Sequence, residues 1–298
     1  MRKSAVPVCL LLTGLAAGAS PAAGQDSTSA GAGLLAGIAF GAAKITTLRT
    51  ERALSGDLAY QPRPWLTFSA TPTFIRATQD SAGTSFTSSG VGDLPLGVAV
   101  EQDLPGAWSP SVAASLGVTL PTGSTQCGLG SGETGVGLDV GAGVSPMDPL
   151  HVSVGASRGL SGVSSQSALT APKATSLSMD ASLDLAEGWT ASLSFSGDFG
   201  AVDSTQALSR DLGFGASHSL GKRLAVTLDG SAGLTAGSPR WALSLGIGTT
   251  FSGVSPVGAN SPFRRLKRAF VGSVGRGSGH GKIGGGRKGG GTSASTSC

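Results

Sequence analysis

Residues 92–123 read GDLPLGVAVEQDLPGAWSPSVAASLGVTLPTG and contain two runs in which apolar and small polar side chains alternate. Every second residue from Leu94 to Val100 is apolar, and the same holds from Val112 to Leu120. A period of two residues is that of a β-strand with one apolar and one polar face. The segment DLPGAWSP between the runs contains Pro and Gly and predicts a turn, so we expect an antiparallel hairpin.

The same alternation recurs as far as Phe251, and its polar face carries mainly Ser, Thr, Gly and Asp. A soluble β-sandwich would place larger polar residues, such as Lys and Glu, on its wet face. Apolar side chains that face lipid and polar side chains that face a lumen are typical of an outer-membrane barrel. We therefore predict an all-β fold, an antiparallel transmembrane β-barrel, rather than a secreted sandwich or adhesin.

The two ends of the chain differ from the alternating region. Residues 1–24 combine Arg2 and Lys3 with a short apolar run and the small residues Ala22-Ala23-Gly24, which is the pattern of a cleaved signal peptide. Residues 252–298 are rich in Gly, Lys and Arg and contain no Asp or Glu, so we expect a disordered tail. Without the ten basic residues of these two ends, the predicted barrel at 25–251 has 11 basic and 17 acidic residues.

The length of the connections indicates how the barrel lies in the membrane. Eleven clear strands are predicted, and a weaker segment at 32–44 supplies a twelfth. Outer-membrane barrels have an even number of strands, long external loops and short periplasmic turns. Pro72 cannot donate a ladder hydrogen bond, so we expect an irregularity there. Long polar connections are predicted at 77–91, 121–134, 161–173 and 201–208, and short ones at 61–64, 104–110, 145–149, 186–188 and 220–223.

Three short segments resemble a known family. They are GVGDLPLG at 90–97, LPTG at 120–123 and GLGSGETG at 128–135. In this order and spacing they resemble the family named for the meta-pathway of phenol degradation, with similarity over about residues 40–251. The resemblance implies an outer-membrane channel or transporter for small solutes, with aromatic or hydrophobic compounds as candidates.

Seven acidic side chains point to the predicted lumen by strand parity. Acidic residues in a pore favour cations and disfavour anions, so cation preference is the sharper hypothesis. The alternative is that these residues only solvate a water-filled or plugged interior. The predicted pore-lining residues are Asp57, Glu101, Asp139, Asp180, Asp184, Asp198 and Asp229.

No catalytic, cofactor-binding or metal-binding site is predicted. His151 and Ser153 share a face at the spacing of a base and a nucleophile, but they point away from lipid and no third residue orients them. The Gly-rich loop at 128–135 resembles a phosphate cradle, yet a strand rather than a helix follows it. We therefore interpret it as a flexible external loop. Cys127 and Cys298 predict no disulfide framework.

Two hypotheses from different classes follow. In the first, the barrel passes small-molecule solutes passively, and loops 121–134 and 161–173 narrow its mouth. In the alternative, the barrel does not conduct and serves as an envelope anchor, with the basic segment RRLKRAFVGSV at 264–274 on peptidoglycan or anionic lipid. The expected partners are membrane lipid and the outer-membrane assembly machinery. No nucleic acid is expected, because a signal peptide and a barrel direct the chain to the envelope.

Overall fold

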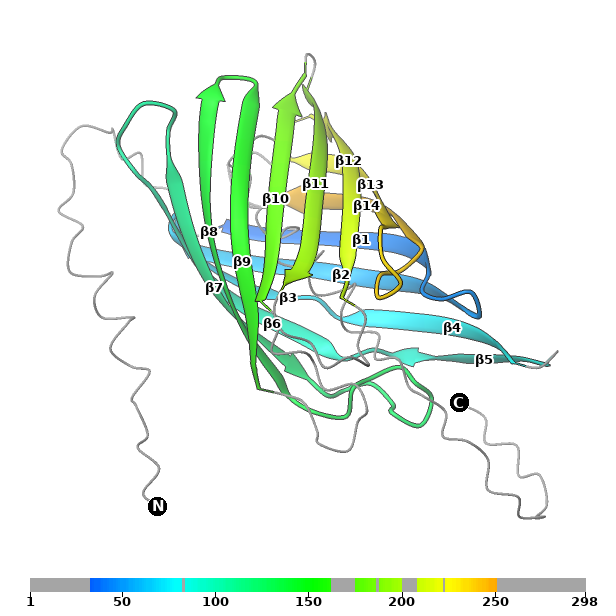
Figure 1. Ribbon diagram of the computed structural model, residues 1–298. Coiled ribbons are helices and arrows are strands. Elements are labelled where there is room, and N and C mark those ends of the chain that lie inside the picture. Colours follow the sequence, from blue (N-terminus) through cyan, green and yellow to red (C-terminus); the bar gives the residue numbers. More distant parts are fainter. Residues whose placement is uncertain are drawn as a thin grey trace, which may run out of the picture. The chain divides into compact units, whose positions relative to one another are not determined.

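The computed structural model describes residues 33–81, 84–161, 175–185, 188–199, 208–221 and 223–250, which all belong to one unit of the chain. Most of them lie in strands (Figure 1). In the described part of the chain, no helix has the length and hydropathy needed to cross a membrane. The strands are β1 (Gly33–Lys44), β2 (Arg49–Arg63), β3 (Leu66–Ala70), β4 (Thr73–Ser81), β5 (Thr84–Val91), β6 (Leu94–Asp103), β7 (Ser111–Leu120), β8 (Gly135–Met147), β9 (Leu150–Ser161), β10 (Thr175–Asp184), β11 (Trp189–Phe199), β12 (Arg210–Leu220), β13 (Leu224–Gly233) and β14 (Trp241–Thr250).

These elements form a closed antiparallel barrel of twelve strands. The barrel closes because β1 pairs with both β2 and β14. Two of the twelve strands are each interrupted once. Strand β2 pairs with β4 and then with β3, while β5 and β6 pair with β4 and β3 in turn. The predicted strand count and the weak first strand at 32–44 are both confirmed.

The interruptions lie side by side and have separate causes. Pro72, where the sequence predicts an irregularity, separates β3 from β4. On the neighbouring strand, Val91 and Leu94 both belong to the outer face, since they pair with Phe74 and Leu120. In a strand with strict alternation, one residue separates two neighbouring outward-facing positions. Here two residues, Gly92 and Asp93, separate Val91 from Leu94. The extra residue is a β-bulge, and a bulge turns a side chain in a new direction.

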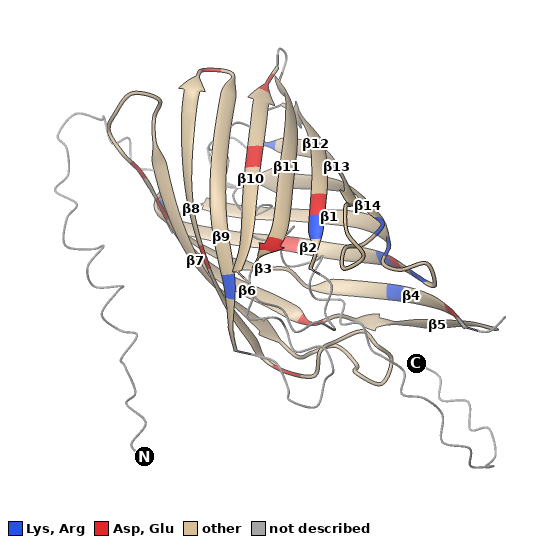
Figure 2. Cartoon of the chain, viewed as in Figure 1, with Lys and Arg blue, Asp and Glu red and all other residues tan. Residues whose placement is uncertain are grey.

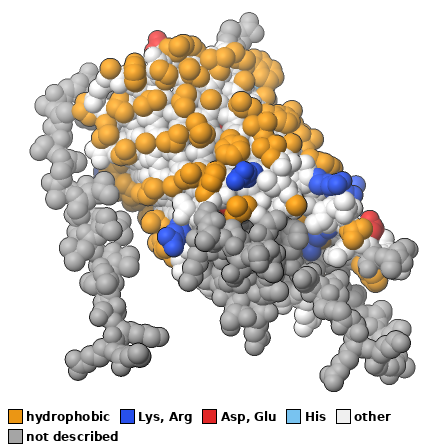
Figure 3. Space-filling model, in the orientation of Figure 1, with side chains coloured by type: hydrophobic (Ala, Val, Ile, Leu, Met, Phe, Trp, Pro, Cys, Tyr) orange, Lys and Arg blue, Asp and Glu red, His pale blue; other side chains and the backbone are white. Residues whose placement is uncertain are grey.

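Apolar side chains cover the outer face of the barrel. Phe40, Leu54, Met179, Leu193 and Leu245 each have more than half of their surface exposed. Figure 3 shows the result as a nearly continuous hydrophobic surface across the strands. Along each strand, the residues between these apolar positions face the inside of the barrel. Most of them are small: Gly, Ala, Ser and Thr. An exposed apolar area of this kind requires a lipid environment.

The prediction of one long loop is wrong. Residues 77–91 were expected to form a long external loop, but they form most of β4 and β5, which pair as far as Ser81 and Thr84. This hairpin is rich in Thr and Ser on both faces, so it lacks the alternation in hydropathy that marks a strand. Thr is nevertheless a good strand former, and the Thr78 and Thr87 hydroxyl groups lie 3.3 Å apart across the pair. The predicted long connection at 121–134 is present, whereas those at 161–173 and 201–208 lie almost entirely outside the described residues.

Candidate lumenal site

The loop between β7 and β8 lies against the inner face of β2, β4 and β5. Its Leu129 is 5% exposed. A Cβ atom at Gly90 of β5 would lie 3.1 Å from Leu129 Cδ1, so the absence of a side chain at Gly90 makes room for Leu129. Gly90 pairs with Ile75, and both belong to the face opposite Phe74 and Val91. The loop therefore folds into the barrel, and its interpretation as a merely flexible external loop is wrong.

Asp93, which the bulge turns toward this loop, is the main acceptor that holds it. Its Oδ1 accepts a hydrogen bond from the Gly123 amide at 3.0 Å, and its Oδ2 accepts from the amide and the hydroxyl of Ser131, both at 2.7 Å. The Thr122 hydroxyl donates to the Gly92 carbonyl at 2.7 Å. The segments GVGDLPLG and LPTG are thus joined directly by hydrogen bonds.

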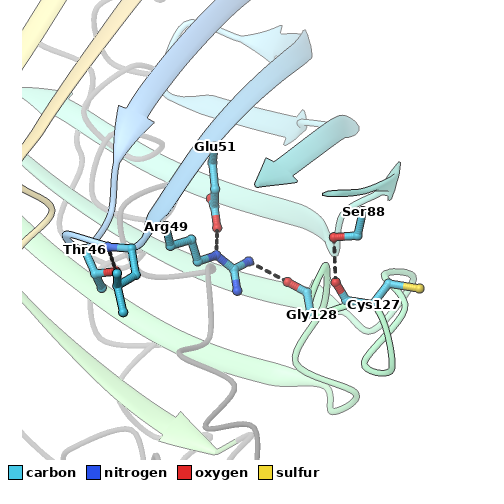
Figure 4. A network of polar contacts seen from close by, with 7 residues as sticks. Thr46, Arg49, Glu51, Ser88, Cys127 and Gly128 are labelled. Carbon is cyan, nitrogen blue, oxygen red and sulfur yellow. Dashed lines mark hydrogen bonds and ion pairs between the residues drawn. The ribbon is translucent and has the colours of Figure 1, made fainter. Parts of the chain in front are cut away.

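A second set of contacts holds the middle of the loop (Figure 4). Arg49 at the start of β2 donates from Nη2 to the Gly128 carbonyl at 2.7 Å and from Nε to Glu51 Oε1 at 2.6 Å. Both side chains of this ion pair are 11% exposed. The Ser88 hydroxyl on β5 donates to the Cys127 carbonyl at 2.9 Å. The loop is therefore attached to the wall at three places, by Asp93, Arg49 and Ser88.

Two glycines of the loop pack backbone against backbone. A Cβ atom at Gly123 would lie 2.5 Å from the Leu129 carbonyl oxygen, and one at Gly130 would lie 2.6 Å from the Gly123 carbonyl oxygen. Neither position can accept a side chain without moving the loop. Gly128 and Gly132 adopt positive φ values of 65° and 77°, a conformation that glycine reaches at little cost. The abundance of Gly in this loop follows from its tight inward path.

Cys127 of the same loop forms a disulfide, although the sequence predicts no disulfide framework. The other cysteines of the chain, Cys9 and Cys298, lie outside the described residues.

The seven predicted lumenal acids all lie on the face opposite the apolar surface. The register places each of them across from small residues, such as Gly37 for Asp57, Ala113 for Glu101 and Gly215 for Asp229. Asp180 lies between Ser153 and Ser194 on the two neighbouring strands. That these residues line a pore stays a prediction.

Hydroxyl groups on the neighbouring strands donate to three of these acids. The Ser176 hydroxyl lies 2.6 Å from Asp198 Oδ1, and the Thr190 hydroxyl lies 2.8 Å from Asp184 Oδ1. The Ser115 hydroxyl lies 3.3 Å from Asp139 Oδ2. The wall itself therefore helps to solvate the negative charges.

Further charged residues on the inner face were missed, among them Asp103, which shares the face of Glu101 on β6. Asp211 lies across from Ser196 and accepts a hydrogen bond from the Ser209 hydroxyl at 2.9 Å. Glu51 and Arg49 face inward from β2 and neutralise one another. Strand parity could have found Asp211, since it precedes Leu212 of the outer face. The loop contact of Arg49 joins residues 79 positions apart, and a pattern within one strand does not reveal it.

His151 and Ser153, which the sequence singles out as a possible base and nucleophile, both lie on β9. His151 is 4% exposed, and its Nδ1 lies 3.1 Å from the hydroxyl of Ser145. Within the described ranges, no group of three His, Cys, Asp or Glu side chains is arranged to hold a metal ion.

Comparisons with known proteins agree with this architecture. The sequence matches the family described as "Putative MetA-pathway of phenol degradation" over residues 20–251. An outer-membrane channel from Pseudomonas putida has 15% sequence identity, a TM-score of 0.53, and coverage of 78% of this chain and 100% of that chain. The KdgM porin has 8% identity, a TM-score of 0.46, and coverage of 72% and 99%. The CymD monoaromatic hydrocarbon channel has 10% identity, a TM-score of 0.42, and coverage of 74% and 88%. A search of the curated proteins finds no match.

The fold and the apolar outer surface together fix the location of the chain. A closed twelve-stranded barrel of this kind, with apolar residues facing outward, is an integral protein of the bacterial outer membrane.

Proposed function

We propose that this chain, which belongs to the MetA-pathway of phenol degradation family, is a channel through which small solutes diffuse passively and in which cations are favoured. The observation that carries the proposal is the charge of the inner face. Seven predicted acids and Asp211 line it, whereas the described strands place one basic residue there, Arg49, which Glu51 neutralises. Acidic rings in a pore attract cations and repel anions.

The inward loop supplies the size limit in this proposal. Loop 121–134 occupies space on the inner face of β2, β4 and β5 and is attached at Asp93, Arg49 and Ser88. Diffusion through the barrel needs no cofactor and no covalent step. The rate at which a solute diffuses through the barrel then depends on the size and charge of that solute.

Liposome swelling tests the proposal with solutes of similar size. We expect vesicles that contain the protein to swell faster in lysine than in glutamine, and faster in glutamine than in glutamate. Protein-free vesicles and heat-unfolded protein are the controls. Equal rates for the three solutes would remove the charge preference, and no swelling would favour the non-conducting anchor.

The family name suggests aromatic solutes, and this finer point needs its own measurement. Phenylalanine and leucine are both net neutral and differ mainly in the aromatic ring. A higher swelling rate for phenylalanine, despite its larger volume, would support selection of aromatic compounds. A rate equal to or below that of leucine would indicate a channel without aromatic preference.

A further inference from the structure

Five basic residues lie on the outer face of the barrel at the end that carries the inward loop. Strand parity places them there: Arg52 belongs to the face of Leu54, Arg76 to that of Phe74, and Arg210 to that of Leu212. In Figure 3 blue side chains follow the border of the hydrophobic surface, and Figure 2 shows blue positions on β4, β9 and β12. The five residues, which we call the basic rim, are Lys44, Arg52, Arg76, Arg158 and Arg210.

Two arginines of the basic rim are direct cross-strand partners. Arg52 of β2 pairs with Arg76 of β4. Like charges in directly opposite positions of a sheet repel one another. In the described part of the chain, neither guanidinium forms an ion pair or a hydrogen bond. Such a pair is stable when an anion lies between the two side chains.

The depth of this pair identifies the kind of anion. Outward-facing residues of β2 and β4 follow one another as Thr50 with Thr78, then Arg52 with Arg76, then Leu54 with Phe74. Leu54 and Phe74 are 52% and 51% exposed. The arginines therefore lie where the polar end of the barrel meets its apolar surface. This is the level at which lipid headgroups meet acyl chains.

The other side of the barrel repeats this arrangement. Arg158 of β9 and Phe199 of β11 are both register partners of Thr175. Arg210 of β12 lies over the Phe199 ring, with 5.4 Å between the guanidinium carbon and the ring centroid. An arginine on an aromatic face keeps its N–H groups free to point sideways. Phe199 thus holds Arg210 at the edge of the apolar surface.

In the part of the chain that the structure describes, negative charge does not balance the basic rim. Glu51, next to Arg52 in sequence, faces inward and is bound to Arg49. Asp80 lies on the outer face of β4, four residues beyond Arg76 toward the tip of the hairpin. At about 3.3 Å per residue, this separation exceeds 10 Å, and no ion pair joins the two in the described residues.

We infer that the basic rim binds the phosphate groups of lipid headgroups, with Arg52 and Arg76 as the main site. Arginine presents a planar fork that binds phosphate through two parallel hydrogen bonds. The acyl chains of the same lipid would lie on Leu54 and Phe74, so one molecule satisfies both the charge and the apolar surface. Because the long loops lie outside the cell in this orientation, the basic rim lies in the outer leaflet. The lipid that binds there is then a phosphorylated glycolipid.

The test compares the stability of the refolded protein in two kinds of vesicle, pure phosphatidylcholine and phosphatidylcholine with added lipid A. The variant is Arg52→Gln/Arg76→Gln. The matched control is Arg63→Gln/Arg223→Gln, which removes two exposed arginines at the opposite, short-turn end. Stability is read from a gel of unboiled samples, as the temperature at which the band of the folded protein disappears.

We expect lipid A to raise the unfolding temperature of the wild type and of the control, and to raise that of the Arg52/Arg76 variant by less than half as much. In pure phosphatidylcholine the Arg52/Arg76 variant should be at least as stable as the wild type, because the repulsion is gone. An equal response of both variants to lipid A would overturn the inference. So would an equal stabilisation of the wild type by inorganic phosphate without lipid A.

Discussion

Asp93 connects a bulge in the barrel wall to the loop that the bulge faces. Three donors, the amides of Gly123 and Ser131 and the Ser131 hydroxyl, converge on its two oxygens. A carboxylate that accepts from backbone amides is a strong and directional anchor. Asp93 therefore holds the loop in its inward path.

Replacing Asp93 by Ala leaves these three donors without their acceptor. Hydrogen bonds to charged groups contribute about 1.5–3 kcal/mol, and each 1.4 kcal/mol is a factor of about ten. We expect amide hydrogen exchange at Gly123 and Ser131 to become at least about tenfold faster. Asp103→Ala, at an exposed position on the short-turn side of β6, is the control. Unchanged exchange in D93A would contradict the role of Asp93 as the anchor.

At the scale of elements, the loop between β7 and β8 depends on glycines that allow close backbone contact. Adding a methyl group at Gly123 would place it 2.5 Å from the Leu129 carbonyl oxygen. We expect Gly123→Ala to move the loop away from the wall and to raise the single-channel conductance. Gly159→Ala is the matched control, since a Cβ atom at Gly159 meets nothing within 4 Å. Equal conductance in both variants would show that the loop does not limit the pore.

The two faces of one strand give a second prediction at this scale. Met179 of β10 is 55% exposed on the outer face, while its neighbour Ser178 faces inward. A basic side chain on the lipid face costs about 2–4 kcal/mol near the bilayer midplane, and less toward the interfaces. We expect Met179→Arg to lower the free energy of unfolding in vesicles, measured by denaturant titration. Ser178→Arg should change this free energy much less. A larger loss in S178R would reverse the assignment of the two faces.

The sequence predicts those elements whose two faces differ in hydropathy. The alternation of Leu94 to Val100 and of Val112 to Leu120 is enough to predict β6, β7 and their lipid-facing side. It fails for the hairpin of β4 and β5, where both faces are polar. It also fails for the inward loop, because the bonds of Asp93 and Arg49 join positions far apart in sequence.

At the scale of the whole molecule, the charges are sorted by face. The described strands place their acids mostly inside and the basic rim outside, with Arg49 and Asp80 as exceptions. A net charge of +4 for the whole chain hides this arrangement, because eight of the basic residues lie in 252–298. We therefore expect a negative potential at the inner face even though the chain is basic overall.

The most direct test of the cation-favouring channel is the reversal potential in a planar bilayer with asymmetric potassium chloride. The proposal predicts discrete current steps and a reversal potential displaced toward the potassium equilibrium value. In Asp139→Asn/Asp180→Asn this displacement should shrink, whereas Asp80→Asn on the outer face should leave it unchanged. A reversal potential at zero or displaced toward the chloride value would contradict the charge preference, and a folded protein that never conducts would contradict the channel itself.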